Sequence, residues 1–481
     1  MSLRATACIS YKKIVVHCTG YGALAQSSSV SLAPFSVVDA FAIARADYIK
    51  RNPRSQERLL AAADAMPGGN TRSSLYHDPF PLCMVRGSGC RLTDVDGHEY
   101  IDFLGEFTAG IFGHSPPALI AAIKTALDDG INLSSHNQIE GRLSALICAR
   151  FPSMDLLRFT NSGTEANLMA LAAAVAFTGR RKILVFENGY HGGVLTFPKG
   201  GSPVTVPHQF LVAPYNDLAA AMELIDAHRS DLAAILVEPM LGAGGCVPAT
   251  CEFLALLRDA ADDVGAVLIF DEIQTSRLSE GGRQAQIGVI PDMTTIGKFF
   301  GGGLAFGCFG GRRDIMALFD PRRPNALTHA GTFNNNTLTM AAGAAAVSTL
   351  LTPENLASVN QRGDVFRDQM NNVFESLGAP FYVTGLGSLM NIHPKPHLGS
   401  IELWRKLLFF DLAERGVYIA ARGLIALSFP IGDDETAMFL EALRGFVDRR
   451  AALFQLANAD DPSASPRSLV CEHVNHEQLT L

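Results

Sequence analysis

The 481-residue chain lacks three features that mark other classes of protein. Its nine cysteines form no CxxC pair, so neither a disulfide framework nor a cysteine-based metal site is expected. No apolar run approaches the roughly 20 residues of a membrane-spanning helix. With 39 Lys and Arg against 47 Asp and Glu, the net charge of -8 argues against a nucleic-acid-binding surface. These absences favour a cytoplasmic protein with reduced thiols, and they predict no metal, membrane or nucleic-acid partner.

Acidic residues are also absent from residues 1–38, which contain Arg4, Lys12 and Lys13 and are rich in serine and alanine. That composition is compatible with a mitochondrial transit peptide, and also with a disordered extension or a start codon placed too far upstream. A mitochondrial location is therefore the alternative to the cytoplasm. The polar segment 459–481 is expected to be a disordered tail.

Between residues 116 and 345, short apolar strand patterns alternate with helical patterns. The expected strands include residues 156–160, 182–186, 232–237 and 267–270, and the expected helices include 165–177, 218–228 and 251–264. Near-continuous apolar strands separated by helices favour a mostly parallel sheet covered on both faces. We therefore predict a large α/β domain over residues 116–345.

Helical and strand patterns are mixed in the segments on either side, 39–115 and 346–458. Residues 39–65 have helical spacing, and the pair Asp96-Gly97 between two strand patterns predicts a hairpin turn. After Pro353, helical segments around a short strand pattern predict a second, α+β unit.

Two residues carry the strongest chemical signal. Asp271 directly follows the buried strand pattern 267–270, where a carboxylate is costly to bury unless it is paired. Lys298 lies beside phenylalanines and glycines without the GxxxxGK[ST] pattern of a nucleotide triphosphatase, and burial there would favour its neutral, nucleophilic form. A lysine that forms an imine and an acid that faces a ring nitrogen are what pyridoxal phosphate requires. The pair predicts an amine-transfer enzyme. The alternatives are a salt bridge or a helix cap for Asp271 and an exposed loop lysine for Lys298.

Further candidates fall where predicted strands end, which is where ligands bind in open α/β sheets. Ser162, Gly163 and Thr164 open a helix whose free N–H groups suit a phosphate, although a plain helix cap uses the same residues. Tyr190 is an aromatic on a glycine-rich loop and suits stacking on a flat ring. Glu238 ends another strand, where it would either contact the cofactor's surroundings or lie in a surface turn.

These motifs, in this order, resemble the class III aminotransferases of the fold-type I pyridoxal-phosphate enzymes over about residues 40–456. Residues 66–72 (MPGGNTR) are similar to the glutamate-1-semialdehyde aminomutase branch. Residues 157–171, 331–336 and 387–391 are similar to the β-phenylalanine (β-amino acid) aminotransferases. The resemblance has a departure at Asn334-Asn335-Asn336, where Gly-Gly-Asn is usual.

The resemblance implies a large domain that holds pyridoxal phosphate and a small α+β domain built from both chain ends. Within one subunit, it implies that Ser162, Gly163 and Thr164 hold the phosphate, that Tyr190 stacks on the ring, that Asp271 pairs with the ring nitrogen, that Gln274 reaches the phenolic oxygen and that Lys298 forms the imine. It also implies a homodimer in which Thr332 contacts the phosphate of the partner's cofactor. By itself, the pattern around Thr332 indicates only a capped helix.

Carried over in the same way, Arg72 would bind the carboxylate of the substrate and Arg422 the carboxylate of the amino acceptor, because guanidinium groups bind carboxylates through two hydrogen bonds. A surface salt bridge is the alternative for each. The expected reaction is a ping-pong transfer from a β-phenylalanine-like β-amino acid to 2-oxoglutarate or pyruvate. A 2,1-aminomutase of the glutamate-1-semialdehyde type is the first alternative, and a non-catalytic fold-type I assembly protein is a more distant one.

Overall fold

The computed structural model describes residues 36–459, so most of the predicted extension 1–38 and of the predicted tail 459–481 lies outside the described residues. The first helix, α1 (Val37–Arg51), begins before the predicted boundary at residue 39 because Ser36 caps it. The Ser36 hydroxyl accepts a hydrogen bond from the Asp39 N–H at 3.2 Å. The helical pattern over 39–65 forms two helices, since Pro53 lacks the N–H needed to continue α1 and instead opens α2 (Pro53–Ala63).

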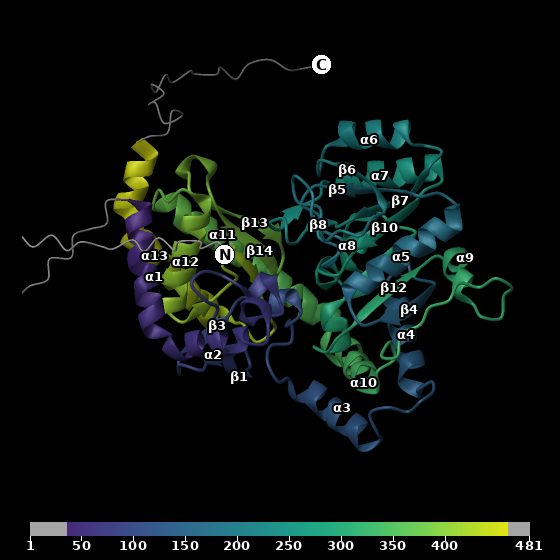
Figure 1. The fold of residues 1–481 in the computed structure, drawn as a ribbon, viewed down its shortest axis with the longest axis horizontal. Helices are drawn as coiled ribbons and strands as arrows, with labels where there is room; N and C mark the ends of the chain where they lie inside the picture. Colours follow the sequence, from purple (N-terminus) through teal and green to yellow (C-terminus); the bar gives the residue numbers. More distant parts are fainter. Residues whose placement is uncertain (1–35, 460–481) are drawn as a thin grey trace, which may run out of the picture.

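A seven-stranded sheet forms the centre of the middle part of the chain, drawn in teal in Figure 1. Its order is β4 (Leu156–Thr160), β12 (Gly307–Gly311), β11 (Met293–Gly297), β10 (Val267–Asp271), β7 (Leu232–Val237), β5 (Lys182–Phe186) and β6 (Gln209–Ala213). Neighbouring strands pair in parallel except at β12, which is antiparallel to both β11 and β4. The predicted mostly parallel sheet is confirmed, and three of its strands have the predicted bounds.

Alternate strand residues pack on opposite faces of this sheet, as the two-residue period of a strand requires. The covering helices include α5 (Gly163–Thr178) on one face and α6 (Leu218–Ala227) and α7 (Cys251–Val264) on the other. In β7, Ala234 and Leu236 join the core with α5, whereas Ile235 and Val237 join the core with α6 and α7. Both faces are therefore dry, and polar groups concentrate at the strand ends.

Helices α3 (Pro117–Asp128), α4 (Gln138–Arg150) and α10 (Thr337–Ala345) pack together beyond the β4 edge of the sheet. Shorter helices, α8 (Gly282–Ile287) and α9 (Arg313–Met316), and a two-stranded ribbon of β8 (Met240–Leu241) and β9 (Val247–Pro248) complete the middle part of the chain. No helix within residues 36–459 is long and apolar enough to span a membrane.

Residues from both chain ends share one further hydrophobic core, which Figure 1 shows beside the sheet-containing part in purple and yellow-green. The elements around it are β1 (Met84–Ser88), β2 (Arg91–Asp94), β3 (Glu99–Asp102), α11 (Pro353–Ser376), β13 (Phe381–Leu386), β14 (Leu389–Pro394), α12 (Ile401–Glu414), β15 (Val417–Tyr418), β16 (Leu424–Ala426) and α13 (Asp433–Ala459), together with α1. β2 and β3 form the predicted hairpin, and β15 joins β3 in parallel. The domain boundaries at 115/116 and 345/346 stay a prediction.

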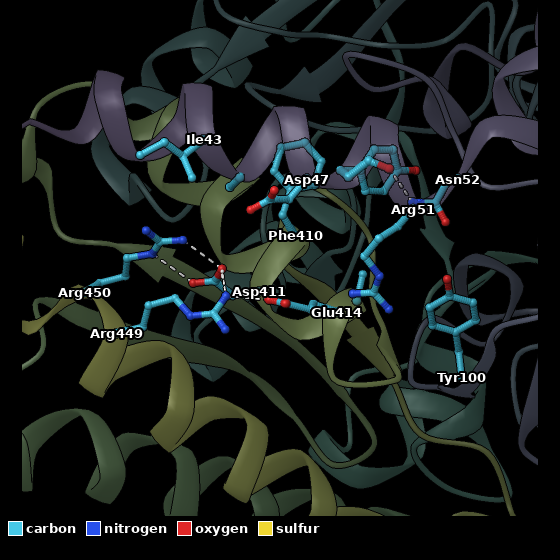
Figure 2. A pocket seen from close by; sticks show the side chains of 13 residues that line it. Ile43, Asp47, Arg51, Asn52, Tyr100, Phe410, Asp411, Glu414, Arg449 and Arg450 are labelled. Atoms are coloured by element: carbon cyan, nitrogen blue, oxygen red, sulfur yellow. Dashed lines mark hydrogen bonds and ion pairs between the residues drawn. The ribbon is translucent and has the colours of Figure 1, made fainter. Parts of the chain in front are cut away.

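A buried ion pair ties α12 to α13 in this part of the molecule. Arg450 donates two hydrogen bonds to Asp411, from Nε at 2.9 Å and from Nη2 at 2.8 Å, and Arg449 donates a third at 3.0 Å. Figure 2 shows both arginines converging on Asp411 beside a cavity of about 250 Å³ that α1 also lines. Because Asp411 and Arg450 are both buried, removing the Asp411 carboxylate leaves the Arg450 guanidinium without its counter-charge.

Candidate active site

A cavity of about 310 Å³ lies at the carboxyl ends of the sheet strands. The structure brings eight of the predicted site residues to its wall: Ser162, Gly163, Thr164, Tyr190, Glu238, Asp271, Gln274 and Lys298. They end or follow β4, β5, β7, β10 and β11, and parallel strands end at one edge of a sheet. Residues far apart in the sequence therefore meet in one place.

One end of the cavity is formed by the N-terminus of α5. The Ser162 hydroxyl caps this helix by accepting a hydrogen bond from the Glu165 N–H at 3.2 Å. The next N–H groups, of Gly163 and Thr164, have no partner within the helix, and the helix dipole adds positive potential there. A Cβ at Gly192 would come within 2.2 Å of Thr164 Oγ1, so only glycine allows the loop to approach this closely. The arrangement suits an anion such as a phosphate.

Asp271 is a buried acidic residue of the cavity lining and is only 4% exposed. Its Oδ2 accepts a hydrogen bond from Asn167 Nδ2 at 2.8 Å and faces His191 Nδ1 at 2.8 Å, while Oδ1 accepts one from the Ile273 N–H at 3.0 Å. The carboxylate is thus fixed in orientation. The sequence reasoning missed Asn167 and gave His191 no role. The available signal was a polar residue four positions after Gly163, on the same face of an apolar helix.

Lys298 follows β11 in the left-handed conformation, with φ of 55°. Its Nζ donates a hydrogen bond to Thr108 Oγ1 at 2.8 Å. Burial lowers the pKa of Lys298 to about 8, although Asp271 and Glu238 attract its positive charge. An amine with this pKa is substantially neutral in mildly alkaline solution and can act as a nucleophile. Nothing in the sequence pointed to Thr108.

Glu238 is 4% exposed and therefore does not lie in a surface turn. Its carboxylate accepts hydrogen bonds from the N–H groups of Tyr190 at 2.9 Å and Gly242 at 3.0 Å, so it fixes the loop that carries the aromatic residue. Burial raises the pKa of Glu238 to about 7, against the opposing effect of His191.

The two arginines expected to bind substrate do not line this cavity, but both guanidinium groups lie over the ring of Phe107. The Cζ atoms of Arg72 and Arg422 are 5.5 and 5.4 Å from its centroid. Arg72 is 42% exposed and forms an ion pair with Glu106. Arg422 is more enclosed: burial lowers its pKa, its Nε has no hydrogen-bond partner within residues 36–459, and with Phe107 it lines a second cavity of about 400 Å³. Thr108 directly follows Phe107 in the sequence. Its contact with Lys298 Nζ therefore links the Phe107–arginine cluster to the lysine.

Thr332 does not line the cavity of its own chain. It is exposed on the loop before α10, next to Phe333, whose side chain is 58% exposed. The same loop contacts the cavity rim, because Asn161 Nδ2 donates to Asn334 Oδ1 at 3.0 Å.

The residues at the cavity fit pyridoxal phosphate. A helix N-terminus for the phosphate, a fixed acid for the ring nitrogen and a low-pKa lysine for the aldehyde share one enclosure. Gln274 Oε1 is buried without a partner within residues 36–459, and a polar ligand would satisfy it. No group of His, Cys, Asp or Glu within the same residues is arranged to hold a metal ion.

Comparisons with known proteins agree with this fit. Residues 73–446 match the family model of class III aminotransferases. The β-phenylalanine transaminase of Variovorax paradoxus is 48% identical over 88% of this chain and 99% of its own length, and its crystal structure superposes with a TM-score of 0.85 over 87% of this chain and 99% of that one. The glutamate-1-semialdehyde 2,1-aminomutase of Sorangium cellulosum is 37% identical over 82% of this chain and 92% of its own length. A transaminase solved with pyridoxal phosphate bound is 33% identical, with a TM-score of 0.79 over 84% of this chain and 99% of that one.

The match covers most of the chain, and the fold, the lysine and the buried acid agree with it. The chain therefore belongs to the class III aminotransferases, pyridoxal-phosphate-dependent transaminases of fold type I.

Proposed function

We propose that the enzyme transfers the amino group of a β-amino acid, of the β-phenylalanine type, to 2-oxoglutarate or pyruvate by a ping-pong mechanism. Identity of 48% to the Variovorax transaminase over nearly the whole of that enzyme supports the choice of donor. The observation that carries the proposal is the pair of arginines over Phe107, one residue from the contact of Lys298. Two cationic side chains near one amine suit two carboxylate substrates that occupy the site in turn.

In this proposal, the cavity residues hold pyridoxal phosphate by its two ends. Ser162, Gly163 and Thr164 bind the phosphate at the N-terminus of α5, and Tyr190 stacks on the ring from a loop that Glu238 fixes. Asp271 pairs with the ring nitrogen, and Gln274 reaches the phenolic oxygen. Once bound, the cofactor supplies an electron sink for the bond that breaks at the substrate carbon.

Lys298 would hold the cofactor by its aldehyde until a substrate amine takes its place. Its Nζ would then move the proton that leaves the substrate carbon, a role that requires a neutral amine held close to that carbon. Burial favours the neutral form of Lys298, and contacts with Asn167, His191 and the Ile273 N–H fix the orientation of the Asp271 carboxyl group. Arg72 orients the donor carboxylate, and Arg422 orients the carboxylate of the acceptor.

We further propose a homodimer in which Thr332 reaches the partner's phosphate. Exposed apolar side chains gather on α3 and just beyond it, at Ile120, Leu127, Ile131 and Leu133. α3 packs against α10, which follows the Thr332 loop, so the two features lie near each other (Figure 1). Exposed apolar side chains in one region of the chain favour association with a second chain.

The second candidate is a 2,1-aminomutase, which the 37% identity to the Sorangium enzyme supports. It would move an amine within one carbon skeleton and need no external acceptor. The presence of both Lys298 and Asp271 in one cavity argues against the third alternative, a non-catalytic assembly protein.

The two reactions are separated by following the absorbance of the bound cofactor in the purified enzyme. We expect β-phenylalanine to bleach the band of the lysine-bound cofactor, and 2-oxoglutarate or pyruvate to restore it. A band that β-amino acids leave unchanged contradicts the choice of donor. Turnover of glutamate-1-semialdehyde without any keto acid would establish the aminomutase instead.

A further inference from the structure

Four consecutive residues after β3 adopt the left-handed backbone conformation. Gly105, Glu106, Phe107 and Thr108 have φ of 53°, 48°, 51° and 80°. This conformation is unfavourable for residues with a Cβ and exceptional for a β-branched threonine. Such strain persists only where the surroundings impose it, and it concentrates at functional sites. The turn 105–108 must therefore be held by strong contacts on both sides.

The N-terminal side of the turn is held by Asp102, a buried carboxylate at the end of β3. It accepts hydrogen bonds from the N–H groups of Leu104 at 2.9 Å and Gly105 at 3.0 Å, and its second oxygen lies 3.0 Å from His114 Nε2. Three contacts with one side chain fix where the turn begins.

The C-terminal side is held by Arg277, which is completely buried. Within residues 36–459, no carboxylate lies within ion-pair distance of its guanidinium. It donates instead to two carbonyl oxygens, of Thr108 at 3.4 Å and of Leu427. Burial of this charge lowers the pKa of Arg277 to about 9. Burying a cation without an ionic partner costs free energy. Because Arg277 donates to the carbonyl oxygens of Thr108 and Leu427, we infer that it joins the turn to the segment after β16.

The turn carries the groups that the reaction uses. The Thr108 side chain is fully buried and its hydroxyl accepts the hydrogen bond from Lys298 Nζ at 2.8 Å. Phe107 lies beneath the guanidinium groups of Arg72 and Arg422. A rigid turn thus sets the distance between the amine and the arginines.

We propose that Thr108 is a positioning residue for Lys298: its hydroxyl holds the lysine amine in place whenever that amine is not bonded to the cofactor. This inference rests on the proposed role of Lys298. An amine that donates one N–H to Thr108 keeps its lone pair for the substrate proton, and its position stays fixed while substrate enters. Fixed geometry of the proton acceptor is what an efficient transfer requires. Thr108 therefore affects the proton-transfer step and leaves substrate binding to the arginines.

Three variants at position 108 separate the hydroxyl from the shape of the side chain. Thr108→Val keeps the shape and removes the hydroxyl, whereas Thr108→Ser and Thr108→Ala both lack the methyl group and differ only in the hydroxyl. In single-turnover reactions of the holoenzyme with β-phenylalanine, we expect rates about 10- to 100-fold lower in Thr108→Val and Thr108→Ala. We expect Thr108→Ser to stay within about threefold of the wild type, with KM for the donor little changed in all three.

A second measurement needs no cofactor. In the apoprotein, acetylation of Lys298 by acetic anhydride across a pH series, quantified by mass spectrometry against the exposed Lys124, reports the protonation of the amine. The Thr108 hydroxyl stabilises the protonated amine by accepting a hydrogen bond from it. Loss of the hydroxyl should therefore lower the pH at which labelling of Lys298 is half complete. Thr108→Val and Thr108→Ala should show this shift and Thr108→Ser should not.

The proposal is overturned if Thr108→Ser behaves like Thr108→Ala, since packing rather than the hydroxyl would then matter, or if all variants match the wild type. If Thr108→Val does not fold, the Ser–Ala pair decides. Failure of the proposed function has a different signature: borohydride reduction would attach the cofactor to a residue other than Lys298, while the labelling series would still report on the Thr108–Lys298 contact.

Discussion

At the scale of single residues, burial in the cofactor cavity moves the pKa values of a lysine and a glutamate toward each other. Burial lowers the pKa of Lys298 to about 8 and raises the pKa of Glu238 to about 7. The depressed pKa of Lys298 gives a contribution to stability that is present above its unfolded pKa and is lost as pH falls through about 8. The raised pKa of Glu238 gives one that is present below its unfolded pKa and is lost as pH rises through about 7.

These shifts predict how the apoprotein takes up its cofactor. The rate of reconstitution with pyridoxal phosphate should rise with pH, with a midpoint near 8, because only the neutral Lys298 amine attacks the aldehyde. Stopped-flow absorbance of the bound cofactor measures this rate. In Glu238→Gln the midpoint should move to lower pH, since an anion that favours the charged lysine is lost. A profile that is flat, or that moves upward in Glu238→Gln, would contradict the assignment.

Substitutions of the two arginines should affect KM for different substrates. We expect Arg72→Gln to raise KM for the amino donor roughly 10- to 100-fold, as the loss of a charge-assisted hydrogen bond implies, and to leave KM for 2-oxoglutarate nearly unchanged. Arg422→Gln should do the reverse. Steady-state kinetics with each substrate varied in turn tests both, and each variant is the control for the other. Equal effects on both substrates would show that one carboxylate site serves both half-reactions.

At the scale of elements, a close approach between a loop and a helix end shapes the cavity, and a buried ion pair joins two helices elsewhere. The loop after β5 meets the N-terminus of α5 at Gly192, whose φ is 128°. In the other part of the molecule, α12 and α13 meet at Asp411. Each contact can be tested by one substitution, with a second substitution that disturbs no such contact as its control.

Gly192→Ala should weaken cofactor binding by roughly tenfold or more, because the strain of a left-handed alanine against Thr164 is of order 1–3 kcal/mol. Gly193→Ala is the matched control, since a Cβ there meets nothing within 4 Å. Equilibrium titration of the apoprotein with the cofactor gives both dissociation constants. Equal losses in the two variants would mean that general loop stiffness, and not this contact, governs binding.

Asp411→Asn should lower the free energy of unfolding by about 3–5 kcal/mol, because it leaves the buried Arg450 guanidinium without its counter-charge. Urea denaturation followed by circular dichroism measures the change. The exposed pair of Asp226 and Arg229 provides the comparison, and Asp226→Asn should cause no measurable loss. Similar midpoints for Asp411→Asn and the wild type would show that Arg450 finds another partner.

The sequence predicted the elements whose signals are local. The strands at 156–160, 182–186 and 232–237 have the predicted bounds because each is a mostly apolar run flanked by polar residues. The turn at 105–108 escaped prediction because three of its residues have no intrinsic preference for the left-handed conformation. Arg277, far along the chain, imposes it. Sequence patterns report the local backbone preference of each residue, and contacts with distant residues override that preference in this turn.

The candidate site divides in the same way. Residues that stand where strands end could be predicted, since parallel strands bring their carboxyl ends together. Asn167 and Thr108 could not, because their roles depend on which side chain lies opposite them: Asp271 in one case and Lys298 in the other.

At the scale of the whole molecule, three stretches of the chain contribute to the proposed site. Arg72 and Phe107 come from the N-terminal part, Lys298 from the sheet-containing part and Arg422 from the C-terminal part. The proposed homodimer would add a fourth contributor, Thr332 of a second chain.

A complementation experiment tests that contribution. Lys298→Ala and Thr332→Val homodimers should each be impaired, the first without covalent cofactor and the second with weaker phosphate binding. In a mixed dimer, one site has the intact lysine and receives the intact threonine. We therefore expect co-expression to restore up to about half the wild-type number of fully competent sites, with a dimer mass by analytical ultracentrifugation. A monomer, or a mixture no more active than its parts, would contradict the shared site.

The first and last described elements, α1 and α13, pack in the same core and away from the catalytic sheet (Figure 1). Anything joined to either end is therefore anchored to the part of the molecule that does not contain the cofactor cavity. The enzyme can be tethered to a resin or fused to a second biocatalyst through α1 or α13, neither of which lines the cofactor cavity. The same layout makes the ends, rather than the cavity loops, the natural attachment points for building an amine-synthesis cascade.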